Sequence, residues 1–203
     1  MSGPSAVLAA AVVSASCQAQ PPQPAAAAQA APTGPAAPSP FLATSSIREL
    51  MQSMVAPSAQ GLWDAVGRVS DAKGTRDIEP KTDEEWAAVR RHAISLMEST
   101  NLLMIQGRHV ARAGEQTNKV DDADPGAELP PDLIEKRINQ QWAVWIGMAQ
   151  ALHTSAASLL DAVDKKDVAR LESTGSDLDG VCETCHLTFW YPPRPARQGL
   201  LLP

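Results

Sequence analysis

Apolar residues recur at alternating intervals of three and four along most of this chain, and that period constrains the fold more than any other feature. It is clearest between Trp86 and Val110 and again between Ile134 and Val163. Such spacing places apolar side chains along one face of a helix, which is buried against other helices in a globular protein. No convincing run alternates apolar and polar residues, so the sequence predicts an all-α fold.

Capping signals, prolines and turn residues divide the pattern into four predicted helices. The first opens at Ser46 and should bend or break at Pro57, and the second opens at Thr82. The third follows Pro131, and the fourth follows a short break at residues 164–167. Short connections between amphipathic helices favour an antiparallel up-down-up-down four-helix bundle. Predicted core-facing positions include Val66 and Val69 in the first helix, Gly107 and Val110 in the second, Gln141 in the third, and Leu171, Gly175 and Leu178 in the fourth.

The first 47 residues carry no charged side chain, and we expect them to include a disordered N-terminal extension. Residues 1–17 contain an apolar run of the length of a signal-peptide core, which predicts export. Either signal peptidase cleaves this segment, or Cys17 ends a lipobox-like sequence and carries a lipid that tethers the protein to a membrane. Residues 18–44 form an Ala- and Pro-rich linker, and residues 192–203 form a C-terminal tail.

Two cysteines and a histidine lie near the C-terminal end of the fourth predicted helix, in the sequence Cys182-Glu183-Thr184-Cys185-His186. Covalent attachment of haem needs two thiols about one helical turn apart, one for each vinyl group, and an imidazole that reaches the iron. Cys182 and Cys185 are three residues apart, so both face the same way on a helix. The motif therefore predicts one covalent haem c, held by both cysteines and ligated by His186.

Three other interpretations of the motif carry less weight. A structural zinc site needs four ligands, usually two such pairs, and the sequence offers one pair. A redox-active dithiol normally follows a strand and opens a helix, whereas this motif closes a helix. The remaining alternative is a pair of core cysteines beside a surface histidine.

Residues 45–191 resemble the class II cytochromes c, the cytochrome c-prime family. The resemblance rests on the haem motif near the C-terminus, on the aromatic residues Phe189-Trp190-Tyr191 after it, and on Ile47-Arg48-Glu49-Leu50-Met51 in the first helix. It implies an antiparallel four-helix bundle with haem between the helices, export to the periplasm and, in many members, a homodimer. The interruption at Pro57 and the longer loops after residues 70 and 112 depart from the family pattern.

The second axial ligand of the iron decides between two functions, because a Met/His pair suits electron transfer and an open face binds gases. In such a bundle the end of the fourth helix lies level with the start of the first and the end of the second. Met51 is preferred, because it also matches the position of the methionine in six-coordinate members of the family. Other candidates at this level are Met54, Met104 and His109. Residues expected to lie too far away are His92, Met97, Met148 and His153.

Further side chains are expected near the haem. Arg48 and Arg108 lie at the right level to pair with its propionates, although each could equally be an ordinary surface arginine. Trp142 and Trp145 are expected to wall the pocket, although tryptophan in a helical seam needs no functional reason.

These residues predict an exported electron carrier that exchanges electrons with a redox partner protein. The alternatives are a five-coordinate cytochrome that binds nitric oxide or carbon monoxide, and a helical interaction lipoprotein without haem. A net charge of -6 and a pI near 5.2 argue against a nucleic-acid binder. We find no catalytic constellation, so we do not expect an enzyme.

Overall fold

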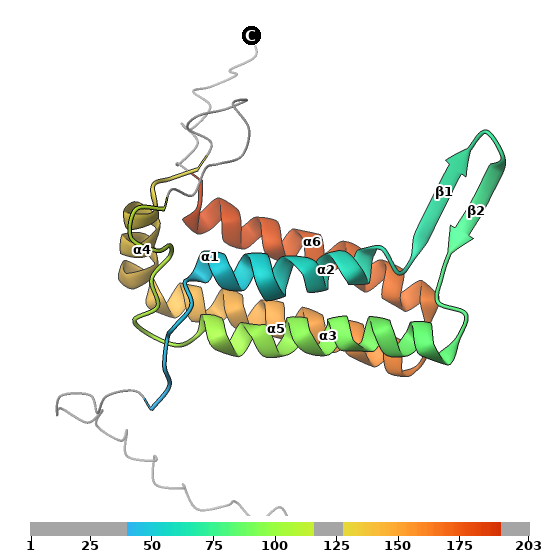
Figure 1. Cartoon of the computed structure of the whole chain (residues 1–203), viewed down its shortest axis with the longest axis horizontal. Helices are drawn as coiled ribbons and strands as arrows, with labels where there is room; N and C mark the ends of the chain where they lie inside the picture. The colour runs from blue at the N-terminus through green and yellow to red at the C-terminus, as the bar shows by residue number, and fades with distance from the viewer. Residues whose placement is uncertain (1–39, 116–127, 192–203) are drawn as a thin grey trace, which may run out of the picture. The chain divides into compact units, whose positions relative to one another are not determined.

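The computed structural model describes residues 40–115 and 128–191, and this part of the chain is mostly helical (Figure 1). The predicted signal segment with Cys17, most of the predicted linker and the predicted tail lie outside the described residues. Within the described part, no helix combines the length and the apolar character that crossing a membrane requires.

The first helical segment consists of α1 (Ile47–Leu50), the π-helical turn η1 (Met51–Val55) and α2 (Ala56–Trp63). Its predicted start at Ser46 is confirmed. The Ser46 hydroxyl accepts a hydrogen bond from the backbone N–H of Glu49 at 3.1 Å, and the Glu49 carboxylate accepts one from the Ser46 N–H at 3.0 Å. This reciprocal pair satisfies two N–H groups that a helix start would otherwise leave without partners.

The predicted interruption at Pro57 takes the form of η1. Proline has no N–H to donate, and in a regular α-helix its ring would clash with the carbonyl four residues earlier, that of Ser53. The wider turn directly before Pro57 relieves this conflict, and within it the Ala56 N–H bonds to the carbonyl of Met51, five residues earlier. The helix therefore continues through the proline instead of ending there.

A two-stranded hairpin, β1 (Gly67–Asp71) and β2 (Gly74–Ile78), follows α2, so the prediction of an all-α fold was wrong here. Its strands lack the apolar alternation by which strands are recognised. Polar groups hold them instead, such as the ion pair between Arg68 and Asp77 at 2.7 Å. The turn uses Asp71, which accepts a hydrogen bond from the Lys73 N–H at 2.8 Å, and Gly74, whose φ of 118° favours glycine. Val69 therefore lies in a strand, and Val66 lies between α2 and β1, not in the first helix.

The remaining helices begin close to their predicted starts. Thr82 caps the second predicted helix as expected, but this helix ends at Leu103 and does not reach Val110. Gly107, with a φ of 82°, lies in the non-helical segment beyond it. The third predicted helix is divided at Gln141, which is exposed and not in the core, and neither proline nor glycine marks this break. The helices are α3 (Asp83–Leu103), α4 (Pro131–Gln140), α5 (Trp142–Asp164) and α6 (Val168–Phe189).

Helices α3, α5 and α6 pack together, with α5 in contact with both of the others. Helix α2 packs against α3 and also touches α6. The predicted apolar seams supply the core. The largest fully buried side chains include Leu62, Leu96, Ile134, Trp145, Leu159, Leu171, Leu178 and Phe189.

Leucine-to-alanine substitutions should separate core from surface. Leu159 is fully buried, so Leu159→Ala should lower the free energy of unfolding by about 2–5 kcal/mol, because it removes apolar contacts and leaves a cavity. Leu133, which is 43% exposed, is the matched control, and Leu133→Ala should cost about 0.5 kcal/mol or less. Urea unfolding followed by circular dichroism measures both, and equal losses would contradict the assigned core.

Candidate cofactor site

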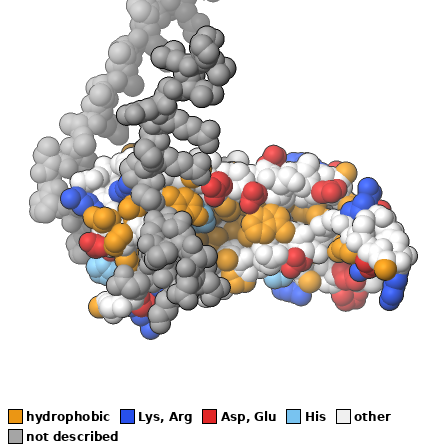
Figure 2. Space-filling view, turned by 90° about the horizontal axis from the view of Figure 1, so that it is seen from above, with side chains coloured by type: hydrophobic (Ala, Val, Ile, Leu, Met, Phe, Trp, Pro, Cys, Tyr) orange, Lys and Arg blue, Asp and Glu red, His pale blue; other side chains and the backbone are white. Residues whose placement is uncertain are grey.

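The two cysteines and the histidine of the predicted haem motif line one cavity between the helices. Its volume is about 230 Å³, and about 870 Å³ when the part open to solvent is included. Figure 2 shows hydrophobic side chains gathered around a hollow on the face seen from above. The lining residues are Met51, Val55, Ala56, Ala59, Gln60, Trp63, Leu103, Trp145, Met148, Ala149, Leu152, Val181, Cys182, Cys185 and His186.

Helix α6 places the motif in the cavity wall. Cys182 and Cys185, one turn apart, are both partly buried and packed against the core. His186 follows in the last turn of the helix, where its carbonyl accepts the N–H of Trp190 at 2.8 Å. The predicted common face of the two thiols is therefore present, and the imidazole lines the same space.

The environment of the two thiols is not that of a reactive dithiol. Burial, with a smaller contribution from the neighbouring Cys182, raises the pKa of the Cys185 thiol to about 12. Burial and the nearby Asp179 carboxylate also raise the pKa of Cys182. Reactive cysteines have lowered pKa values. The raised pKa values of Cys182 and Cys185 instead disfavour the thiolate form. Among the described residues, no three His, Cys, Asp or Glu side chains are grouped so that they could hold a metal ion.

Aromatic rings surround the end of α6. Trp145, which was expected to wall the pocket, does line it, whereas Trp142 is not among the lining residues. The Trp145 indole N–H donates to the carbonyl of Leu103 at 2.8 Å, and its ring meets Phe189 edge-on with centroids 5.4 Å apart. The ring centroids of His186 and Trp190 are 5.9 Å apart. These contacts fix the side of the cavity that lies next to the imidazole.

Of the four candidates for a second axial ligand, Met51 alone lines the cavity. Met54 and Met104 pack against the core elsewhere. His109 is largely exposed, and its Nδ1 lies within hydrogen-bond distance of the Glu135 carboxylate, at 3.1 Å.

Met148 also lines the cavity, so the prediction that it lies too far from the motif was wrong. That prediction assumed one uninterrupted third helix and judged the level of Met148 from its start. The other residues expected to be distant do not line the cavity. His153 bonds to the hydroxyl of Thr100 at 2.9 Å, and the His92 ring lies beside Gly61, close to where a Cβ atom would be.

The start of α1, which carries Met51 toward the cavity, is tied to the segment after α3. The backbone N–H groups of Ile47 and Arg48 donate to the carbonyls of His109 and Val110 at 2.9 and 3.0 Å. These bonds satisfy two more of the N–H groups at the helix start. They also set the position of Met51, one turn further along.

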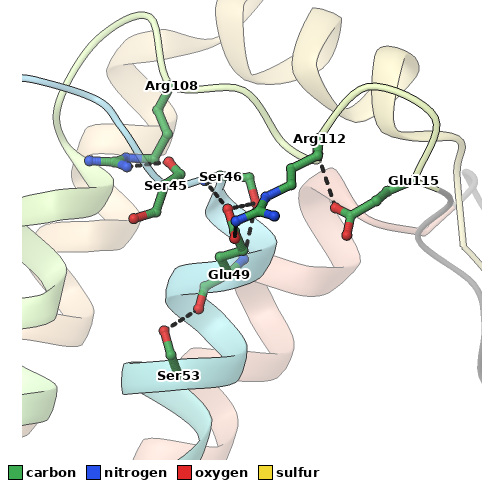
Figure 3. A network of polar contacts seen from close by, with 7 residues as sticks. All are labelled: Ser45, Ser46, Glu49, Ser53, Arg108, Arg112 and Glu115. Atoms are coloured by element: carbon green, nitrogen blue, oxygen red, sulfur yellow. Dashed lines mark hydrogen bonds and ion pairs between the residues drawn. The ribbon is translucent and has the colours of Figure 1, made fainter.

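Two arginines reinforce this connection (Figure 3). Arg112 forms an ion pair with Glu49 of the capping box. Arg108 is 8% exposed and donates to the carbonyls of Ser45 and Leu102, the latter at 3.0 Å. Burial lowers the pKa of Arg108.

The two arginines predicted to meet the propionates do not line the cavity. Arg108 instead donates hydrogen bonds from its Nε and one terminal nitrogen to the backbone carbonyls of Leu102 and Ser45. Arg48 lies close enough to Glu128 to act on its charge. Burial raises the pKa of the Glu128 carboxyl, and the nearby His186 and Arg48 partly offset this rise.

Sequence reasoning missed the wall that α2 provides. Trp63 lines the cavity, and its indole N–H donates to the carbonyl of Gly175 in α6 at 2.9 Å. A signal was present, because Met51, Val55, Ala59 and Trp63 follow one another at intervals of four and so share a helical face. The expected break at Pro57 obscured this continuity.

Comparison of the chain with known protein families, with curated proteins and with solved structures gives no match. Support for a function therefore comes from the residues of the site.

Replacing Arg108 tests its structural role. Arg108→Met should lower the free energy of unfolding by about 1–3 kcal/mol, because two backbone carbonyls lose a charged donor. Arg112→Met is the control, and its effect should be smaller because Arg112 is 70% exposed. Urea unfolding measures both, and a loss for Arg108→Met no larger than that for Arg112→Met would contradict the role.

Proposed function

We propose that this chain is an exported c-type cytochrome of the class II kind, with one covalently attached haem, and that it transfers electrons. The observation that carries the proposal is that Cys182, Cys185 and His186 line one apolar cavity together with Met51. Two thiols one turn apart, an adjoining imidazole and a thioether from another helical segment are the side chains that such a haem requires.

The chemistry of the cavity lining fits a haem, because the lining is mostly apolar and includes both thiols and the imidazole. Cys182 and Cys185 would hold the group through thioether bonds, and His186 would ligate the iron. When bound, haem supplies one-electron redox chemistry. The chain's own contribution is an apolar wall from α2, α5 and α6 that excludes water and so influences the redox potential.

The proposed architecture is the antiparallel up-down-up-down four-helix bundle that the resemblance implies. In support, α5 packs against α3 and α6, and α2 packs against α3 and touches α6. The turn between α5 and α6 spans only residues 165–167, as neighbouring antiparallel helices require. The hairpin is then an insertion between the first two helices of the bundle.

Electron transfer is preferred over gas binding because Met51 borders the same space as His186. Met51 would supply its thioether to the iron together with the imidazole of His186, and a Met/His pair raises the redox potential of a haem. Without such a ligand the chain would be a five-coordinate, gas-binding cytochrome.

The proposed location is the periplasm, where such haems are attached. Cys17 is then either a lipid anchor or part of a cleaved signal. The net charge of -6 suits a basic redox partner, and the resemblance adds a homodimer as a possible assembly.

Covalent attachment is the first test. The full chain, produced in cells that mature c-type cytochromes, should gain the mass of one haem and keep it on denaturation. Cys182→Ser and Cys185→Ser should each shift the absorption of the reduced protein, because one thioether is lost, and the double variant should release the haem on denaturation. A colourless wild-type protein would contradict the proposal and favour the alternative of a helical interaction lipoprotein without haem.

Carbon monoxide tests the second ligand. The reduced wild-type protein should bind it slowly, and Met51→Ala should bind it at once, because the iron gains an open face. Met148→Ala is the matched control, since Met148 lines the same cavity, and it should behave as wild type. Rapid carbon monoxide binding by the wild type would instead favour the gas-binding function. Rapid binding by Met148→Ala and not by Met51→Ala would make Met148 the ligand.

A further inference from the structure

The exposed side of α6 carries acidic side chains and no basic ones. Lys and Arg are absent from the sequence between residues 171 and 189, which form most of this helix. Four exposed acids lie in the same stretch, and we call them the α6 acids: Glu172, Asp177, Asp179 and Glu183. No described residue forms an ion pair with them, although the charge of Glu172 acts on Arg68 of β1.

Acidic side chains at the junction of α5 and α6 are arranged differently. Asp161 pairs with Lys165 and Arg170 at 2.9 and 2.6 Å, and Asp164 pairs with Arg90 at 2.7 Å. Such pairs offset opposite charges within the chain. The α6 acids lack partners of this kind among the described residues, so their combined field acts on molecules that approach this side of the protein.

The α6 acids lie next to the cofactor motif. Glu183 directly follows Cys182, and the charge of Asp179 acts on the Cys182 thiol. Both thioether bonds of the proposed haem would be made to α6, so the haem would be attached to this helix. An α-helix with its side chains is about 10–12 Å across. A protein docked on the exposed side of α6 is therefore separated from the site of attachment by no more than one helix.

An uncharged surface lies beside the α6 acids, between α5 and α6. Residues 142–160 of α5 contain no charged side chain. The two helices run in opposite directions (Figure 1), so the exposed side chains of Val144 and Leu187, at 44% and 43%, lie toward the same end of the pair. A shallow groove between the helices is lined by Met148, Ala151, Asp177, Gly180, Val181 and Thr184. An apolar centre with a charged rim is the usual composition of a protein–protein interface.

We propose that the exposed side of α6, together with the groove between α5 and α6, is the docking surface for a basic electron-transfer protein. This inference rests on the proposed haem. Lys and Arg side chains of the partner meet the α6 acids, and an apolar patch of the partner covers the groove. One electron passes between the iron of this chain and the one-electron centre of the partner, and neither a proton nor a bond is transferred. A second copy of this chain fits less well, because a twofold contact through this surface brings like charges together.

Charge reversal tests the rim of this surface. The reduced holoprotein is mixed in a stopped-flow instrument with the oxidised form of a lysine-rich class I cytochrome c, which serves as the basic probe. Asp177→Lys combined with Glu183→Lys should lower the second-order rate constant about tenfold or more at low ionic strength, because attraction becomes repulsion. Near 0.5 M salt the loss should largely disappear, because salt screens exposed charges.

The matched control changes the net charge by the same amount elsewhere. Glu79 and Glu84 are exposed acids just before α3 and in its first turn, at the end of the bundle opposite the motif (Figure 1). Glu79→Lys combined with Glu84→Lys should lower the rate constant about threefold or less. The redox potential and visible spectrum of each variant, measured separately, show whether the haem site itself has changed.

Two further measurements test the position of the surface. Val144→Ser should lower the same rate constant about threefold, whereas Leu133→Ser should not, although Leu133 is 43% exposed and so matches Val144 in exposure. Carbodiimide treatment of the wild-type mixture joins carboxylates to lysine amines. Peptide mapping should then find the probe attached to Asp177, Asp179 or Glu183.

Three outcomes would overturn the inference. They are equal slowing by the two lysine pairs, cross-links that lie mainly outside α6, and a wild-type dimer that is altered by Asp177→Lys with Glu183→Lys, which would assign the surface to a second copy. If the change at Glu183 prevents haem attachment, Asp177→Lys alone is compared with Glu79→Lys alone, and equal rates count against the inference. A colourless wild-type protein would be seen first and would count against the proposed function itself.

Discussion

The position of the first helical segment along α6 is the constraint on which the candidate site depends. At one end, the N–H groups of Ile47 and Arg48 bond to carbonyls of the segment after α3. At the other end, the indole of Trp63 bonds to the carbonyl of Gly175. Between these anchors the segment forms one wall of the cavity, and a slide of one residue would break backbone bonds at the start and the indole bond at the end. Hydrogen bonds, which are directional, fix this alignment more strictly than apolar packing alone could.

The chemistry of the wall follows from this alignment. The cavity is bordered by thioether, thiol, indole and aliphatic groups, with Gln60 and His186 as its polar members. The raised pKa of Cys185 has the same origin, because few polar groups are available to stabilise a thiolate there. A largely apolar space of this kind favours a ligand that is held mainly through apolar contact area. The polar interactions that hold the segment in place lie outside the cavity. There, Arg108 and Arg112, in the chain that follows α3, contact Ser45 and Glu49 at the start of α1.

Helix starts and buried seams could be predicted because short-range chemistry determines them. Ser46 and Thr82 cap as their side chains require, and the spacing of apolar residues in α3 and α6 identifies their buried faces. The hairpin could not be predicted, since exposed charge pairs stabilise it and apolar alternation is absent. The role of Arg108 and the wall formed by Trp63 depend on partners 63 and 112 residues away in sequence, and no local pattern encodes such contacts.

The π-helical turn at Met51–Val55 determines how many residues can separate the two ends of the first helical segment while both ends line the cavity. A π turn contains one residue more than the α turn it replaces, so a deletion within it would restore a regular helix. In a regular α-helix, the twelve steps from Met51 to Trp63 would turn the chain by about 1,200°, which is about 120° past three full turns, because an α-helix has about 3.6 residues per turn. The wider turn takes up the extra residue, so Met51 and Trp63 both line the same cavity. A one-residue deletion is therefore best accommodated within the π turn, whereas the same deletion in the regular part of α2 before Trp63 would rotate Trp63 by about 100° away from the cavity.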